Sequence, residues 1–170
     1  MDLRFAVGLI GSVILVSGVI IPALRWKDLL FATGNACMFT YALIGYLTGG
    51  SIFFLILQIY IALSTLCMLL KVPDAFDTPL LAIAGVGLVA WSLSLFEGYS
   101  TALFVIGLAM LGIGFAMNGG TRRREIFLML GSVVIAVFSF LMKDWIFVGL
   151  NAAFAFFSFL NILRMERQKR

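Results

Sequence analysis

Long apolar runs and short polar breaks alternate along the whole chain. A helix needs about 20 predominantly apolar residues to cross the hydrocarbon core of a bilayer, with about 17 as the lower limit. Seven runs approach or reach this length. They cover residues 3–23, 29–47, 52–70, 79–96, 101–117, 126–142 and 145–163. The pattern therefore predicts an all-α membrane protein with seven transmembrane helices.

The breaks between these runs contain residues that end helices or favour water. Pro22 closes the first run, and the turn residues 48–51 separate the second run from the third. Pro73 and Pro79 bracket the longest predicted loop, residues 71–78. A signal peptide is the alternative for the first run, but that run is long for one and no A-x-A cleavage site follows it.

Composition supports a chain that uses lipid as its solvent. Hydrophobic residues make up 63% of the chain and charged residues only 12%. In soluble domains, roughly a quarter of all residues are charged. The chain has no histidine, so imidazole proton relays and the commonest metal ligand are excluded. Cys37 and Cys67 lie in apolar runs without CxxC spacing, which is typical of small buried thiols. We expect no cofactor and no metal.

Basic residues are distributed unequally over the two sides of the membrane. If odd-numbered runs pass from outside to inside, one side has ten basic residues and the other has only Arg4 and Lys143. The ten are Arg25, Lys27, Lys71, Arg122, Arg123, Arg124, Arg164, Arg167, Lys169 and Arg170. Such an excess is typical of cytoplasmic loops. It predicts a multi-pass protein of the cell inner membrane, with its N-terminus outside, its C-terminus inside and a basic cytoplasmic tail at 164–170. We expect these basic residues to set topology, and we expect no nucleic-acid site.

An internal repeat relates the first three predicted helices to the last three. Residues 5–9 are similar to 104–108, residues 25–35 to 122–132, and three polar or small residues of the third run to three of the seventh. The last set pairs Gln58, Ala62 and Thr65 with Asn151, Ala155 and Ser158, at a constant offset of 93. These matches predict two parallel three-helix repeats, residues 1–70 and 101–163. Residues 71–100 then form a linker that contains an inverting helix.

A second alignment competes with this one. It pairs Lys27 and Asp28 with Lys143 and Asp144, and Asn35 with Asn151, but it relates helices of opposite direction and needs a gap. We rank it second.

Several short motifs resemble a known superfamily. They are the basic loop before residues 29–47, the segment 46–50 that leads to Gln58, and the ending 160–164 with its basic tail. With the 3+1+3 layout, the chain resembles the SWEET, PQ-loop and PnuC-like superfamily of small transporters. Within or near it, the chain looks most like YgjV-like bacterial inner-membrane proteins. The resemblance implies a pocket between the repeats, with Asn35, Gln58 and Asn151 at pocket positions and Ser132 in place of an amide.

The candidate chemistry inside the predicted helices is neutral. Every charged residue lies at a predicted helix end or in a loop, so neither proton coupling through a buried carboxylate nor an enzyme is expected. The candidates for a solute pathway are polar or aromatic: Asn35, Tyr41, Gln58, Thr65, Trp91, Asn151 and Ser158. The same groups could instead bond between helices and stabilise packing.

Two function classes follow from this chemistry. The first is a transporter or facilitator of a small uncharged or weakly charged solute. The alternative is a non-transporting scaffold or regulatory subunit, and an oligomer is compatible with both. The sequence leaves the substrate and the energy coupling open.

Overall fold

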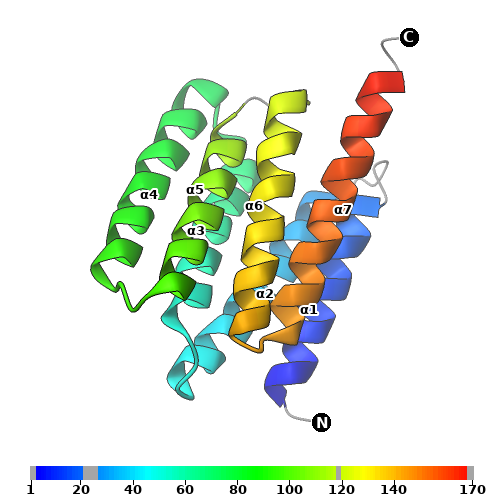
Figure 1. Ribbon diagram of the computed structural model, residues 1–170. Helices are drawn as coiled ribbons and strands as arrows, with labels where there is room; N and C mark the ends of the chain where they lie inside the picture. The colour runs from blue at the N-terminus through cyan, green and yellow to red at the C-terminus, as the bar shows by residue number, and fades with distance from the viewer. Residues whose placement is uncertain (1–2, 21–26, 118–119, 168–170) are drawn as a thin grey trace. The chain divides into compact units, whose positions relative to one another are not determined.

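The computed structural model describes residues 3–20, 27–117 and 120–167, and seven helices contain nearly all of these residues (Figure 1). They are α1 (Leu3–Ile20), α2 (Lys27–Leu47), α3 (Ile52–Leu69), α4 (Asp74–Ser94), α5 (Tyr99–Ala116), α6 (Arg122–Leu141) and α7 (Trp145–Arg167). The described residues contain no strand. The all-α prediction is therefore confirmed, with one helix in each predicted apolar run.

Six of these helices, α2 to α7, are long and apolar enough to cross a membrane. The apolar part of α1, Leu3–Gly18, is shorter. The six helices support a multi-pass membrane protein. Pro22, which was expected to close the first helix, lies outside the described residues.

Three helix ends differ from the prediction by four residues or more. Residues 74–78 were predicted as loop, but they form the first turn of α4, where Asp74 and Asp77 complement the positive end of the helix dipole. Pro79 is the sixth residue of α4, where its missing N–H removes one backbone hydrogen bond of the helix. α6 begins at Arg122, four residues early, since the Thr121 hydroxyl caps it by accepting the backbone N–H of Arg124.

The third difference is at the end of α7. This helix continues through Arg167, about one turn beyond the predicted end. Arg164 and Arg167 therefore belong to its last turn, where positive charge favours the negative end of the helix dipole.

The chain forms two compact units, residues 1–73 with α1 to α3 and residues 74–170 with α4 to α7. In the first unit, α2 packs against both α1 and α3. In the second unit, consecutive helices pack against each other, so α6 contacts α5 and α7, and α4 contacts α5.

Glycines allow the closest helix crossings in both units. In the first unit, a Cβ on Gly34 would lie 2.6 Å from Cγ of Leu15, so α1 and α2 meet with almost no space between them. In the second unit, a Cβ on Gly131 would lie 2.9 Å from the backbone nitrogen of Leu111 in α5. Small residues bring helix backbones together in this way in membranes, where packing replaces the hydrophobic effect.

Candidate functional site

Two of the predicted pathway residues hydrogen-bond each other in the first unit. The side-chain amide of Asn35 in α2 donates to the hydroxyl of Thr65 in α3 at 2.5 Å, and that hydroxyl donates to the carbonyl of Ile61 at 2.8 Å. Asn35 is buried and Thr65 is half-buried. Both groups are satisfied, so this pair stabilises the contact between α2 and α3.

Gln58 has a different environment. Its side chain is only 1% exposed, and its Oε1 atom has no hydrogen-bond partner among the described residues. Gln58 lies seven residues before Thr65, so the two share a face of α3. It also lies six residues from the start of α3, which is about 9 Å at 1.5 Å per residue. A buried amide oxygen at this depth can accept a hydrogen bond from water or from a solute.

Tyr41 packs against α1, with Arg4 above it. The guanidinium carbon of Arg4 lies 4.7 Å from the centre of the Tyr41 ring, within cation–π distance. A Cβ on Gly8 would meet the same ring at 2.6 Å, and a Cβ on Gly45 would meet Nη2 of Arg4 at 2.7 Å. These glycines open the space that the ring and the guanidinium occupy. Arg4 was predicted only as a charge at the outer side of the membrane, because its position in the sequence does not indicate a contact with α2.

In the second unit, Asn151 and Ser158 share the buried face of α7. Asn151 is 5% exposed, and its amide nitrogen donates to the carbonyl of Phe147, one turn earlier in the same helix, at 2.9 Å. Ser158 is 8% exposed. In the predicted repeat, Ser132 corresponds to Asn35 and Ser158 corresponds to Thr65. No hydrogen bond joins Ser158 to Ser132 in the described part of this unit, so the bond between Asn35 and Thr65 has no counterpart here.

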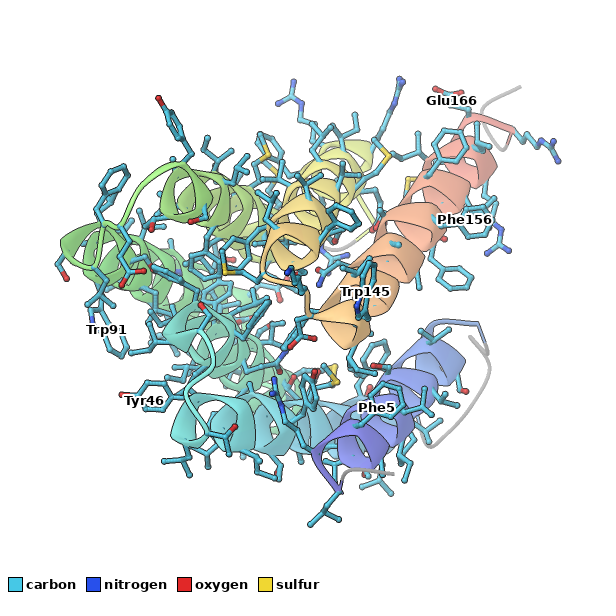
Figure 2. All side chains as sticks on the ribbon, turned by 60° about the horizontal axis from the view of Figure 1, so that its bottom comes forward. Phe5, Tyr46, Trp91, Trp145, Phe156 and Glu166 are labelled. Atoms are coloured by element: carbon cyan, nitrogen blue, oxygen red, sulfur yellow. The ribbon has the colours of Figure 1, made fainter. Side chains whose placement is uncertain are left out.

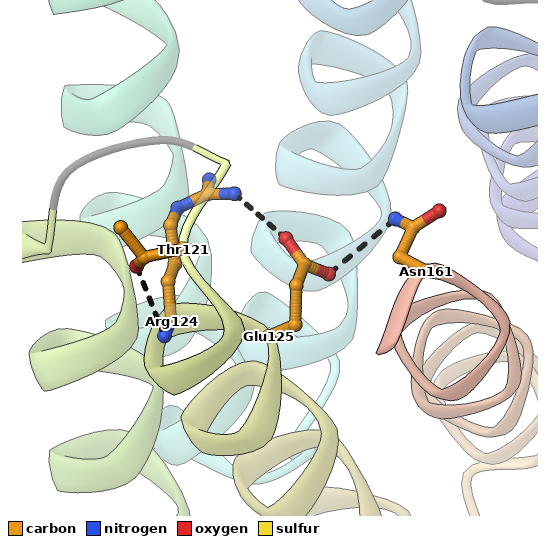
Figure 3. Close-up of polar contacts among 4 residues, drawn as sticks. All are labelled: Thr121, Arg124, Glu125 and Asn161. Atoms are coloured by element: carbon orange, nitrogen blue, oxygen red, sulfur yellow. Dashed lines mark hydrogen bonds and ion pairs between the residues drawn. The ribbon is translucent and has the colours of Figure 1, made fainter. Parts of the chain in front are cut away.

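A buried carboxylate lies where α6 begins and α7 ends (Figure 3). Glu125 is 5% exposed; its Oε1 accepts from Nη1 of Arg124 at 3.1 Å, and its Oε2 accepts from the amide of Asn161 at 3.4 Å. Beside it, Arg122 and Glu166 form an exposed ion pair at 2.9 Å. Sequence reasoning placed Glu125 at a helix end, but its burial and its link to α7 depend on residues 36 positions away.

The remaining predicted residues are Trp91 and the basic residues expected to set topology. Trp91 is 41% exposed and projects outward from α4 (Figure 2). Of the topology-setting residues, Arg25 lies outside the described residues and Lys27 begins α2. Arg122, Arg123 and Arg124 form the first turn of α6.

In the described ranges, no three or more Cys, Asp or Glu side chains form a group that could hold a metal ion. Comparisons with protein-family models, curated proteins and solved structures find no match to this chain.

Proposed function

We propose that this protein is a transporter or facilitator of a small uncharged or weakly charged solute in the cell inner membrane. The buried amide of Gln58 carries this proposal. Leaving a buried acceptor without a donor costs about 1–3 kcal/mol. A water molecule or a solute that donates to Oε1 of Gln58 would remove this cost, so the amide fits a hydrated path better than a sealed core.

The chemistry of the amide favours a neutral solute. An amide offers one acceptor and two donors without a charge, so it can bind hydroxyl, carbonyl and N–H groups. The described charged side chains of α3 to α7 lie at helix ends or in the connecting loops. These helices therefore offer a strongly charged solute no compensating charge at the level of Gln58, and the guanidinium of Arg4 in α1 already packs on the Tyr41 ring.

Matching contacts in the two units support a transporter built from two parallel repeats. Four contacts between α1 and α2 have counterparts between α5 and α6, with offsets of 96 for the first helix and 97 for the second. They pair Gly8–Tyr41 with Phe104–Phe138, Gly11–Met38 with Gly107–Ile135, Leu15–Gly34 with Leu111–Gly131, and Gly18–Phe31 with Gly114–Leu128. The sequence predicted an offset of 97 for residues 25–35, and the contacts of the second helix have the same offset. For residues 5–9 the sequence predicted an offset of 99, which is three more than the 96 of the contacts of the first helix.

The third helix of each proposed repeat, α3 or α7, adds to this support. Ser51 caps α3 by accepting the N–H of Phe53, and Asp144, 93 residues later, accepts the N–H of Phe147 at the start of α7. Gln58 and Asn151 follow these residues at the same spacing of seven. Each repeat therefore carries an amide about 9 Å from the start of its third helix. The two repeats thus offer the same neutral group at corresponding positions.

Cysteine accessibility tests the pathway without knowledge of the solute. In a variant in which Cys37 and Cys67 are replaced by alanine, Gln58→Cys is treated with a charged, membrane-impermeant thiol reagent. We expect labelling, because water reaches this position. Ile56→Cys is the matched control: Ile56 is 0% exposed, lies in the same helix on another face, and should resist the reagent.

Transport itself is tested in proteoliposomes. Swelling in iso-osmotic solutions of neutral polyols and nucleosides is compared for the wild type and for Gln58→Leu with Asn151→Leu. We expect faster swelling in at least one solute, and loss of that swelling in the folded double variant. A non-transporting scaffold predicts no labelling of Gln58→Cys and no swelling above empty vesicles, and either result would contradict the proposal.

A further inference from the structure

Five arginines surround the end of the second unit where α6 begins and α7 finishes. We call this group the arginine rim; it consists of Arg122, Arg123, Arg124, Arg164 and Arg167. The ion pair between Arg122 and Glu166 shows that the two helix ends lie at the same level. Figure 2 shows Glu166 in the last turn of α7. Clusters of four to eight basic residues beside a membrane-spanning helix are typical of sites for anionic lipids.

The structure divides these arginines into two groups. Arg122 pairs with Glu166 at 2.9 Å, and Arg124 pairs with Glu125 at 3.1 Å. Both acids of the rim are used in these pairs, so the two paired arginines add no net charge.

The other three arginines, Arg123, Arg164 and Arg167, are exposed. No ion pair or hydrogen bond joins them to any residue that the structure describes. The rim therefore has three uncompensated positive charges. At the opposite end of the same helices, the adjacent residues Lys143 and Asp144 together add no net charge.

We propose that Arg123, Arg164 and Arg167 bind the phosphate headgroups of anionic membrane lipids. A guanidinium presents a planar fork of N–H donors that matches phosphate oxygens. The rim lies at the ends of two helices that are long and apolar enough to cross a membrane, which is the level of lipid phosphates. Free phosphate shares this chemistry, but it lacks the acyl chains that would place it beside α6 and α7.

Lipid titration of the purified full chain tests this proposal. Binding of phosphatidylglycerol, with phosphatidylcholine as the neutral reference, is measured in neutral detergent by native mass spectrometry and by the shift in melting temperature. The test variant is R123Q/R164Q/R167Q. Each arginine near an anionic surface contributes about 1 kcal/mol, or about five-fold in affinity. We expect the triple variant to bind phosphatidylglycerol about 100-fold more weakly, with its helix content and its lipid-free melting temperature unchanged.

Two matched controls separate the rim from general charge effects. R122Q/E166Q removes an exposed ion pair without changing net charge, and Lys143→Gln removes a cation from the other end of the helices. Both should bind phosphatidylglycerol as the wild type does. Wild-type affinity in the triple variant, or an equal loss in Lys143→Gln, would overturn the proposal. So would an equal shift in melting temperature with inorganic phosphate, since the ligand would then be a free anion.

Discussion

Glycines at the helix crossings determine how closely the helices of each unit approach. A Cβ on Gly131 would lie 2.9 Å from both Cγ and the backbone nitrogen of Leu111, so α5 and α6 would have to separate. Gly87, by contrast, has no atom within 4 Å of the same added Cβ. The two glycines have the same chemistry, but only one of them is required by packing.

This difference predicts opposite effects of alanine. Gly131→Ala should lower the free energy of unfolding by about 1–3 kcal/mol through overpacking. Gly87→Ala should leave it unchanged or raise it by up to about 1 kcal/mol, because alanine favours the helix. Both are measured by denaturant titration in mixed micelles. If the internal repeat is correct, Gly34→Ala should resemble Gly131→Ala; equal stability of all three variants would contradict the packing argument.

Polar contacts between α6 and α7 differ in burial, and so in their expected contribution. Asn161→Leu removes one donor from the buried carboxylate of Glu125 and should cost about 1–2 kcal/mol. Glu166→Gln removes an exposed ion pair with Arg122 and should cost at most about 0.5 kcal/mol. The same unfolding titration compares them. A larger loss in Glu166→Gln would mean that the buried contact does not hold these helix ends together.

Helices themselves are the features that apolar runs predict best, and their ends are predicted less well. α3 was predicted within one residue at each end, since Ser51 caps its start and a short apolar run defines its length. α4 and α6 begin earlier than predicted because charged residues occupy their first turns. Charge suggests a loop when only hydropathy is considered, although Asp74 in α4 favours the helix N-terminus.

The cap of α3 gives a prediction for a single element. Ser51→Ala removes the acceptor for the N–H of Phe53, and it should lower the free energy of unfolding by about 1 kcal/mol. Thr40→Ala is the control: the Thr40 hydroxyl bonds within α2 on an exposed face, so alanine should have little effect. Equal losses in the two variants would mean that the cap does not stabilise α3.

In the whole molecule, the number of membrane-spanning helices determines whether the two termini lie on the same side of the membrane. Six helices meet the length and hydropathy expected of a span, whereas the apolar part of α1 is shorter. If α1 also crosses, the two termini lie on opposite sides. We expect a reporter active only in the cytoplasm to work at the C-terminus and to fail at the N-terminus, in agreement with the charge bias. Activity at both ends would mean an even number of spans.

The candidate site was only partly predictable. Asn35, Gln58 and Thr65 were selected as polar residues in apolar helices, and the structure places all three in α2 or α3. It then separates them, because Asn35 and Thr65 satisfy each other while Oε1 of Gln58 has no partner among the described residues. Trp91, which was predicted as a candidate because an indole N–H within a helix needs a partner, lies on an exposed face of α4. The burial of Glu125 was not anticipated.

The amino-acid sequence by itself determined the all-helical class, the apolar helices and the unequal distribution of charge. These are local properties, since hydrophobicity and helix period depend on residues a few positions apart. Only the tertiary structure decided which polar groups are satisfied, which arginines are paired and which glycines are required by packing. Those outcomes depend on partners far along the chain, such as Thr65 for Asn35 and Asn161 for Glu125. Hydrogen bonds and van der Waals contacts act over a few ångströms in space, and periodicity contains no information about that distance.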